Sequence, residues 1–224
     1  MSSDKTSHNK PIAIDAINGY TKWAALYTAD VHNNFMVVEE LAMQELLPIV
    51  KDKACLDLAC GSGRYLRHLQ QHASVAIGCD ISSAMLQHAR SYKLNNLVQC
   101  SFFPLPFAND SIDLITCGLA VGHCQDLAML LTESARVLCK NGSIVYSDFH
   151  PFASLSGEHR VFTGTDGFKY RLEHYTHLYS DHFSACQASG LVIEAIIEPL
   201  GGLHAPSGWE KKPVVLAVRA RKIT

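Results

Sequence analysis

Short apolar runs alternate with segments of helical spacing along the middle of the chain. Apolar runs at about 54–58, 75–79, 97–100, 112–117 and 143–147 have the length of buried strands. Helices are expected between them at about 62–71, 82–91 and 126–139, with Ser82 as an N-cap and residues 140–142 as a stop signal. Strands that alternate with helices predict an α/β fold of parallel βαβ units with helices on both faces of the sheet.

The two ends of the chain depart from this alternation. Aromatic residues at positions 20, 23 and 27 predict one face of a helix, and a longer helix is expected from about 33 to 47, before Pro48. Residues 149–178 are rich in glycine, aromatic residues and histidine, and 168–175 alternates like an extended segment. A helix at about 181–189 precedes strands at 191–197 and 213–218, whose short link favours antiparallel pairing.

Composition narrows the class of protein. The chain has 224 residues with 48% hydrophobic and 18% charged residues, which is ordinary for one globular domain. The net charge of −2 gives no electrostatic reason to expect nucleic acid or an anionic membrane as a partner. Residues 1–10 are expected to form a loose polar tail without the apolar core of a signal peptide. The eight cysteines include no C-x-x-C pair, so reduced thiols, no metal site and a cytoplasmic location are expected.

A glycine turn in residues 55–66 is the first candidate site. The strand breaks at Gly61–Gly63 and becomes a helix, and ligands of α/β sheets bind at such carboxyl ends. Leu66 replaces the third glycine of a dinucleotide motif, and no phosphate-loop lysine follows. Asp57 lies inside the strand, while Asp80 ends the next strand, where a carboxylate binds ribose hydroxyls. An adenosine ligand with an amino-acid-like end, such as S-adenosylmethionine, suits this pattern.

Four stretches carry a resemblance to a known family. Leu56-Asp-Leu-Ala-Cys-Gly-Ser-Gly63 and Gly78-Cys-Asp-Ile-Ser-Ser-Ala-Met85 resemble the first two motifs of the class I S-adenosylmethionine-dependent methyltransferases. Residues 105–113 and 135–142 resemble signatures of the ubiquinone/menaquinone-type and malonyl-carrier-protein-type members. The resemblance covers about residues 50–150. It implies a single Rossmann-like domain with a mostly parallel seven-stranded sheet and an antiparallel last strand.

The resemblance also implies which residues bind S-adenosylmethionine. Asp57, Gly61 and Gly63 would hold the methionine end, and Asp80 would bind the ribose. Ser101 stands where the family usually has an acidic residue that meets the adenine amino group. The full expected set is Asp57, Ala59, Gly61, Ser62, Gly63, Asp80, Ile81, Met85, Ser101, Phe102, Gly118 and Leu119.

The methyl acceptor is not fixed by these motifs. A sulfonium methyl is already activated, so a base is needed only for an acceptor that is protonated at working pH. Catalytic candidates are His123, beyond the fourth strand, and Asp148 and His150, which follow the fifth. Packing against the cofactor or helix capping is the alternative for His123. Tyr20, Trp23 and Tyr27 are expected to bind substrate as part of a lid, with plain packing against the domain as the alternative.

These expectations define a division of the chain and a function. Residues 1–50 would form a helical lid or substrate segment, and residues 51–224 a methyltransferase domain with a substrate-facing insertion at about 149–178. The expected activity is methyl transfer to an oxygen or nitrogen of a small molecule in secondary or cofactor metabolism, without a nucleic-acid or membrane partner. The alternatives are a malonyl-carrier-protein carboxylate O-methyltransferase, an NAD(P)-dependent oxidoreductase and a non-catalytic adenosyl-binding protein. Neither the acceptor nor the oligomeric state follows from the sequence.

Overall fold

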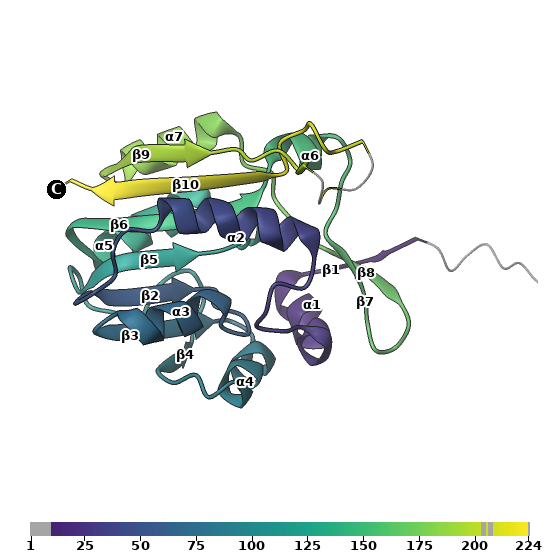
Figure 1. Ribbon diagram of the computed structural model, residues 1–224, viewed down its shortest axis with the longest axis horizontal. Coiled ribbons are helices and arrows are strands. Elements are labelled where there is room, and N and C mark those ends of the chain that lie inside the picture. The colour runs from purple at the N-terminus through teal and green to yellow at the C-terminus, as the bar shows by residue number, and fades with distance from the viewer. Residues whose placement is uncertain (1–9, 203–204, 206–207, 224) are drawn as a thin grey trace, which may run out of the picture.

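A seven-stranded sheet forms the centre of the molecule (Figure 1). The computed structural model describes residues 10–202, 205 and 208–223, so the expected loose tail lies outside the described residues except for Lys10. The strand order is β4-β3-β2-β5-β6-β10-β9, and β10 alone runs antiparallel to its neighbours. The strands are β2 (Ala54–Leu58), β3 (Val75–Asp80), β4 (Leu97–Gln99), β5 (Ile112–Cys117), β6 (Leu138–Phe149), β9 (Leu191–Ile197) and β10 (Val215–Lys222). The predicted mostly parallel sheet with an antiparallel last strand is confirmed.

Helices cover both faces of this sheet (Figure 1). Because side chains of a strand point alternately to opposite faces, Leu56 packs with Leu130 on one side and Cys55 with Leu66 on the other. The predicted placement of helices on both faces of the sheet is confirmed. One face carries α2 (Asn34–Leu46), α3 (Arg64–His72) and α4 (Ser83–Ser91), and the other carries α5 (Leu127–Val137) and α7 (Tyr179–Ala188). None of these or the other described helices is long and apolar enough to cross a membrane.

A second, small sheet joins the two ends of the chain beyond the carboxyl ends of the central strands (Figure 1). Strand β1 (Ile12–Ile14) pairs parallel with β8 (Lys169–Leu172), which pairs antiparallel with β7 (Val161–Thr163). Helix α1 (Ala16–Trp23) follows β1, and the short helix α6 (Pro151–Leu155) opens the insertion. The N-terminal segment and the insertion therefore form one structural cap, although about 150 residues separate them in sequence.

The spacing of the N-terminal aromatic residues predicts one shared helix face, but the structure does not have it. Helix α1 ends at Trp23 and continues as the 3₁₀ helix η1 (Ala24–Leu26), so Tyr27 lies beyond both. The tighter 3₁₀ winding changes the direction of the side chains, which breaks the helical spacing. The three rings still pack together, with Tyr20 and Trp23 stacked at 5.9 Å between centroids and Trp23 and Tyr27 edge-on at 5.1 Å.

Other boundaries shift where tertiary contacts override the local pattern. Helix α5 ends at Val137, and β6 runs through the predicted turn at 140–142. Leu138 already pairs with Ile112 of β5, and a register shift with Asn141 at φ 65° absorbs the turn. In contrast, the expected N-cap is confirmed, because Ser82 accepts a hydrogen bond from the Met85 amide at 3.3 Å.

Candidate active site

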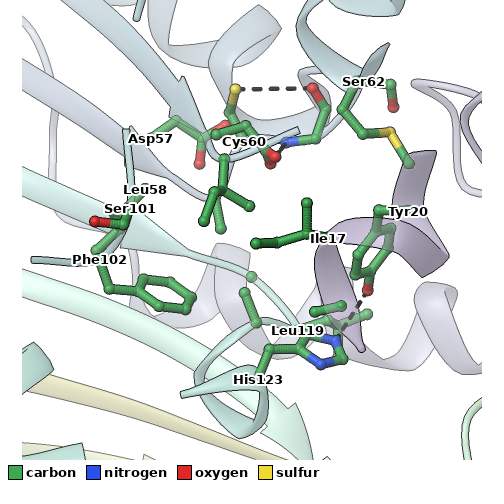
Figure 2. Close-up of a pocket in the computed structure, with 18 of the residues that line it drawn as sticks. Ile17, Tyr20, Asp57, Leu58, Cys60, Ser62, Ser101, Phe102, Leu119 and His123 are labelled. Carbon is green, nitrogen blue, oxygen red and sulfur yellow. Dashed lines mark hydrogen bonds between the residues drawn. The ribbon is translucent and has the colours of Figure 1, made fainter. Parts of the chain in front are cut away.

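A cavity of about 400 Å³ opens at the carboxyl ends of β2, β3 and β5 (Figure 2). The chain proceeds from β2 outward to β3 on one side and returns to β5 on the other, so this is the switch point of the sheet, where α/β proteins bind ligands. Ile17 and Tyr20 of α1 face Asp57, Leu58 and Phe102 across the cavity. Its size suits a ligand of nucleoside dimensions.

The glycine turn brings backbone to the cavity wall. Gly61 has a φ of +54°, and a Cβ added there would have no atom within 4 Å, so the backbone borders open space. Gly63 has a φ of +95°, but a Cβ there would lie 2.1 Å from the Leu94 side chain. Gly61 therefore lines the cavity, whereas Gly63 lies behind it and allows α3 to pack closely.

Asp57 is a buried acid on the cavity wall. Its carboxylate accepts hydrogen bonds from the Thr116 hydroxyl at 2.8 Å and the Leu66 amide at 2.9 Å. Burial raises the pKa of Asp57 to about 7, despite the lowering effect of these two donors. The carboxyl group thus ionises close to neutral pH, and a positively charged ligand group beside it would favour the ionised form.

Asp80 connects the second motif to the glycine turn. One carboxylate oxygen accepts from the Gly61 amide and the other from the Ser82 amide, each at 2.8 Å. Burial raises the pKa of Asp80 above its usual value, although both amides favour the ionised form. A carboxylate has about four lone-pair sites, so Asp80 keeps capacity to accept from ligand hydroxyls.

A buried ion pair that the sequence interpretation missed borders the same cavity. Arg64 Nη2 lies 2.6 Å from Glu39 Oε2, and Arg64 Nη1 is buried without a hydrogen-bond partner among the described residues. Glu39 is fully buried and also accepts from the hydroxyls of Tyr65 and Ser147, at 2.8 and 2.5 Å. The sequence did contain a sign that Glu39 is buried, because it lies four residues after Phe35 on the apolar face of its helix.

The structure brings almost all of the expected cofactor set together. Ser101 donates its hydroxyl to the Phe103 carbonyl at 2.7 Å, so toward the cavity it offers oxygen lone pairs. Gly63 alone of the set does not line the cavity. The members that do are Asp57, Ala59, Gly61, Ser62, Asp80, Ile81, Met85, Ser101, Phe102, Gly118 and Leu119.

His123 lies at the far corner of the cavity, beside Tyr20 (Figure 2). Its Nδ1 is 2.9 Å from the Glu173 carbonyl oxygen, which only accepts, so Nδ1 carries the proton. Its Nε2 is the acceptor, 3.1 Å from the Tyr20 hydroxyl and 2.8 Å from Arg160 Nη1. Burial, with the charge of Arg160, lowers the pKa of His123 to about 3. The imidazole is therefore neutral at physiological pH.

The other two catalytic candidates lie outside this cavity. Asp148 is buried behind it and accepts from the Gly122 amide and from His174 Nε2, the latter at 3.0 Å. His150 Nδ1 accepts from the Phe152 amide at 3.1 Å, and its Nε2 lies 3.0 Å from Glu198. His150 thus caps α6 and joins it to the end of β9.

A second cavity of about 510 Å³ adjoins the first on the side of the cap. Tyr20, Tyr27 and Leu119 line both cavities, whereas Trp23 lines the second alone. Of the three aromatic residues expected to bind substrate, Tyr20 and Tyr27 therefore lie at the junction of the two cavities, and Trp23 lies in the wall of the second.

Comparison with known proteins gives the same family as the sequence motifs. A family model described as a methyltransferase domain matches residues 56–146. An uncharacterized protein of Haemophilus influenzae is 29% identical over 75% of this chain and 71% of its own length. A malonyl-[acyl-carrier protein] O-methyltransferase of Erwinia billingiae is 29% identical over 53% of this chain, and the match spans 49%, about half, of that relative.

Solved structures agree at the level of the fold. The structure of a putative S-adenosylmethionine dependent methyltransferase from Listeria monocytogenes aligns with a TM-score of 0.72 at 19% identity, covering 84% of this chain and all of that one. The family model over residues 56–146 and these folds support a class I S-adenosylmethionine-dependent methyltransferase, an enzyme that uses S-adenosylmethionine as its cofactor.

Proposed function

We propose that this enzyme transfers the methyl group of S-adenosylmethionine to an oxygen or nitrogen of a small molecule. The observation that carries the proposal is the pair of adjoining cavities that meet at Tyr20 and Leu119. The first has groups that suit an adenosyl ligand, and the second offers room for an acceptor next to it. A cytoplasmic location is part of the proposal, because all eight cysteines are free thiols in the structure.

The cofactor's chemistry matches the groups in the first cavity. Asp57 suits its ammonium group, and the unpartnered Nη1 of Arg64 suits its carboxylate. Asp80 suits the two ribose hydroxyls. Ile81 and Phe102 offer apolar surface to a flat base, and Met85 and Ser101 lie with them. The open backbone at Gly61 allows a ligand to approach closely.

The protein's part in the reaction is to position the acceptor. When bound, the cofactor supplies a methyl group that is already electrophilic. Leu119 and Tyr20 lie where acceptor and methyl group would meet, and Gly118 lies beside them. Holding two reactants in line and excluding water contributes several kcal/mol or more to catalysis. The cap formed by β1, α1 and the 149–178 insertion would position the acceptor and exclude water, whereas α2 packs on the central sheet.

Two alternatives are less well supported. A dinucleotide cofactor needs a small residue at position 66, but Leu66 is fully buried, and its side chain lies 2.5 Å from where a Cβ of Gly78 would be. A malonyl-carrier-protein substrate is suggested by the Erwinia relative, but that match covers only 53% of this chain.

Calorimetry tests the proposal directly. S-adenosylmethionine and S-adenosylhomocysteine should release heat on binding, whereas NAD should not. Asp80→Asn should weaken the binding of S-adenosylhomocysteine by about 1–3 kcal/mol, the cost of losing charged hydrogen bonds. Asp166→Asn is the matched control, because Asp166 is exposed in the loop between β7 and β8. Absence of heat with both adenosyl ligands, or equal effects of the two substitutions, would refute the proposal.

A further inference from the structure

The second cavity has aromatic walls. Six aromatic residues from four separate parts of the chain line it, and they include both tryptophans of the protein. The rings are held in place by stacking, with Phe35 on Phe149 at 4.2 Å and Trp23 on Phe162 at 4.6 Å between centroids. Flat π systems stack favourably against such walls, beyond the gain from burying their area. The six are Tyr20, Trp23, Tyr27, Phe35, Phe149 and Trp209.

A buried guanidinium group also lines this cavity. The side chain of Arg160 is only 9% exposed and lies over the Phe149 ring at 4.7 Å. An aromatic cage without a charge favours cations, such as protonated or methylated amines. A fixed positive charge in the wall reverses that preference and favours an oxygen that is negative or rich in lone pairs. Glu158 and His159, which also line the cavity, are exposed to solvent, so their charges are screened.

Arg160 still has hydrogen atoms to offer to a ligand. Its Nη1 lies 2.6 Å from the Tyr20 hydroxyl, 2.8 Å from His123 Nε2 and 2.9 Å from the Leu119 carbonyl, and these acceptors occupy its two hydrogens. The Tyr20 hydroxyl then donates to His123 Nε2 (Figure 2). The nearest acid to Nη2 is Asp148 at 3.8 Å, which is beyond hydrogen-bond distance. Among the described residues, Nη2 is therefore paired by charge alone.

Among the described residues, none of the buried polar side chains at the junction of the two cavities can take a proton at neutral pH. His123 has its Nε2 lone pair occupied, and burial lowers its pKa to about 3. Burial raises the pKa of Tyr20 above its usual value, so it stays a neutral phenol. Burial acts to raise the pKa of Asp148, but His174 and Arg160 keep it below its usual value, and Asp148 lines neither large cavity. An acceptor that must lose a proton during transfer therefore finds no base among these three buried groups.

We infer that the acceptor is an aromatic ring carrying an already ionised oxygen, of the phenolate or enolate type, which Arg160 holds at the junction of the two cavities. The inference rests on the proposed function and narrows it to O-methylation. The acceptor oxygen forms a bond to the methyl carbon while the carbon–sulfur bond of the donor breaks. The bonding pair goes to sulfur, and no proton has to be removed. Arg160 then positions the nucleophile and keeps it ionised, and the Tyr20 hydroxyl holds the guanidinium group in place.

A set of three matched probes tests this inference. 4-Nitrophenol ionises near neutral pH and absorbs visible light only as the phenolate, 4-nitroaniline has an amine instead, and 4-nitrobenzyl alcohol has an oxygen that does not ionise. Each is titrated into the enzyme saturated with S-adenosylhomocysteine, slightly below the pH at which 4-nitrophenol ionises in water. Quenching of Trp23 and Trp209 reports occupancy of the second cavity, and phenolate absorbance reports the ionised form.

The expected result is selective binding of the phenolate. 4-Nitrophenol should bind at least about tenfold more tightly than the other two probes and become ionised on binding, as a charge-assisted hydrogen bond worth about 1.5–3 kcal/mol requires. With S-adenosylmethionine, it alone should give a methylated product. Equal affinities, tighter binding of 4-nitroaniline, or saturation without phenolate absorbance would overturn the inference. S-adenosylhomocysteine that fails to bind would instead overturn the proposed function.

Two variants and a control locate the oxygen site. Tyr20→Phe keeps the ring and removes one hydroxyl, and it should weaken 4-nitrophenol binding several-fold. Arg160→Gln should weaken it at least about tenfold and abolish the phenolate signal, with unchanged affinity for S-adenosylhomocysteine. Arg171→Gln makes the same change at an exposed position of β8, opposite Val161, and should have no effect. Wild-type binding and ionisation in a folded Tyr20→Phe protein would remove Tyr20 from the site, and the same result in Arg160→Gln would refute the inference.

Discussion

The Tyr20 hydroxyl lies 3.1 Å from His123 Nε2, although 103 positions separate the two residues in the chain. This contact joins the N-terminal cap to the end of β5, at the corner where the two cavities meet. A second contact fixes the position of the proton on His123. Nδ1 donates to the Glu173 carbonyl, which leaves Nε2 as the acceptor from Tyr20. The histidine is thus held as a neutral positioning group.

His123→Gln should lower turnover only modestly. A general base contributes about 10²–10⁴-fold, but a neutral hydrogen-bond acceptor contributes less than about tenfold. With 4-nitrophenol as acceptor and saturating S-adenosylmethionine, the wild-type rate should show no ionisation of His123 between about pH 5 and 8, because its pKa is held at about 3. Rates measured across this pH range for both proteins check the prediction. An inflection near pH 6.5 that disappears in the variant would mean that His123 acts as a base.

Gly61→Ala and Gly63→Ala should have different effects, although the two glycines are two residues apart. Both have positive φ, which costs an alanine about 1 kcal/mol. Gly61→Ala should keep the fold and weaken S-adenosylhomocysteine binding, because its methyl group enters the open cavity. Gly63→Ala should lower the free energy of unfolding by about 1–3 kcal/mol beyond the cost of the positive φ, because its methyl group would lie 2.1 Å from the Leu94 side chain.

Gly167→Ala is the control for this pair. Gly167 has a φ of +81° with no atom within 4 Å of an added Cβ, and it lies in the turn before β8, away from the cavity. It should lose about 1 kcal/mol of stability and keep full affinity. Urea denaturation and calorimetry measure the two quantities. Equal affinity losses at positions 61 and 167 would contradict the role of Gly61 in the wall.

The sheet and the first cavity could be predicted from the sequence because their signals are local. The motif from Leu56 to Gly63 encodes strand, turn and helix within one short stretch, and Asp80 follows the next strand at the same sheet edge. Parallel strands place such carboxyl ends side by side whatever the rest of the chain does. Elements and site residues encoded by such short stretches can therefore be predicted without knowing the tertiary contacts.

The second cavity could not be predicted, because its residues meet only through tertiary packing. Arg160 is a charged residue in a polar loop, and nothing local indicates that it is buried beside Asp148. His123 follows β5 and His150 follows β6, its neighbour in the sheet, but only His123 lines the first cavity. On α2 the apolar Leu41 is 62% exposed, whereas the acid Glu39 is fully buried.

His150→Ala should destabilise the protein and leave its activity unchanged. His150 is buried, caps α6 through the Phe152 amide and contacts Glu198, so its removal should cost about 1–3 kcal/mol. His150→Asn should recover part of this loss, because asparagine is a good N-cap. Thermal unfolding and the affinity for S-adenosylhomocysteine measure the two effects. A folded His150→Ala protein with normal affinity and a tenfold lower turnover would show that His150 acts in catalysis.

Asp57 should make both stability and cofactor binding depend on pH. Burial raises its pKa from 3.8 to about 7 in the folded protein, so folding favours the protonated carboxyl group. Its stabilising contribution is then complete below about pH 4 and is lost as the pH rises to about 7, by up to about 1.4 kcal/mol per pH unit. The free energy of unfolding of the wild type, compared with that of Asp57→Asn, should fall over this range and stay constant above it.

A ligand ammonium group beside Asp57 favours the ionised form, so binding of S-adenosylhomocysteine at pH 6 should release a proton in the wild type and less in Asp57→Asn. Calorimetry in two buffers of different ionisation enthalpy measures that proton, and equal release by both proteins would show that the cofactor's ammonium group does not lie beside Asp57.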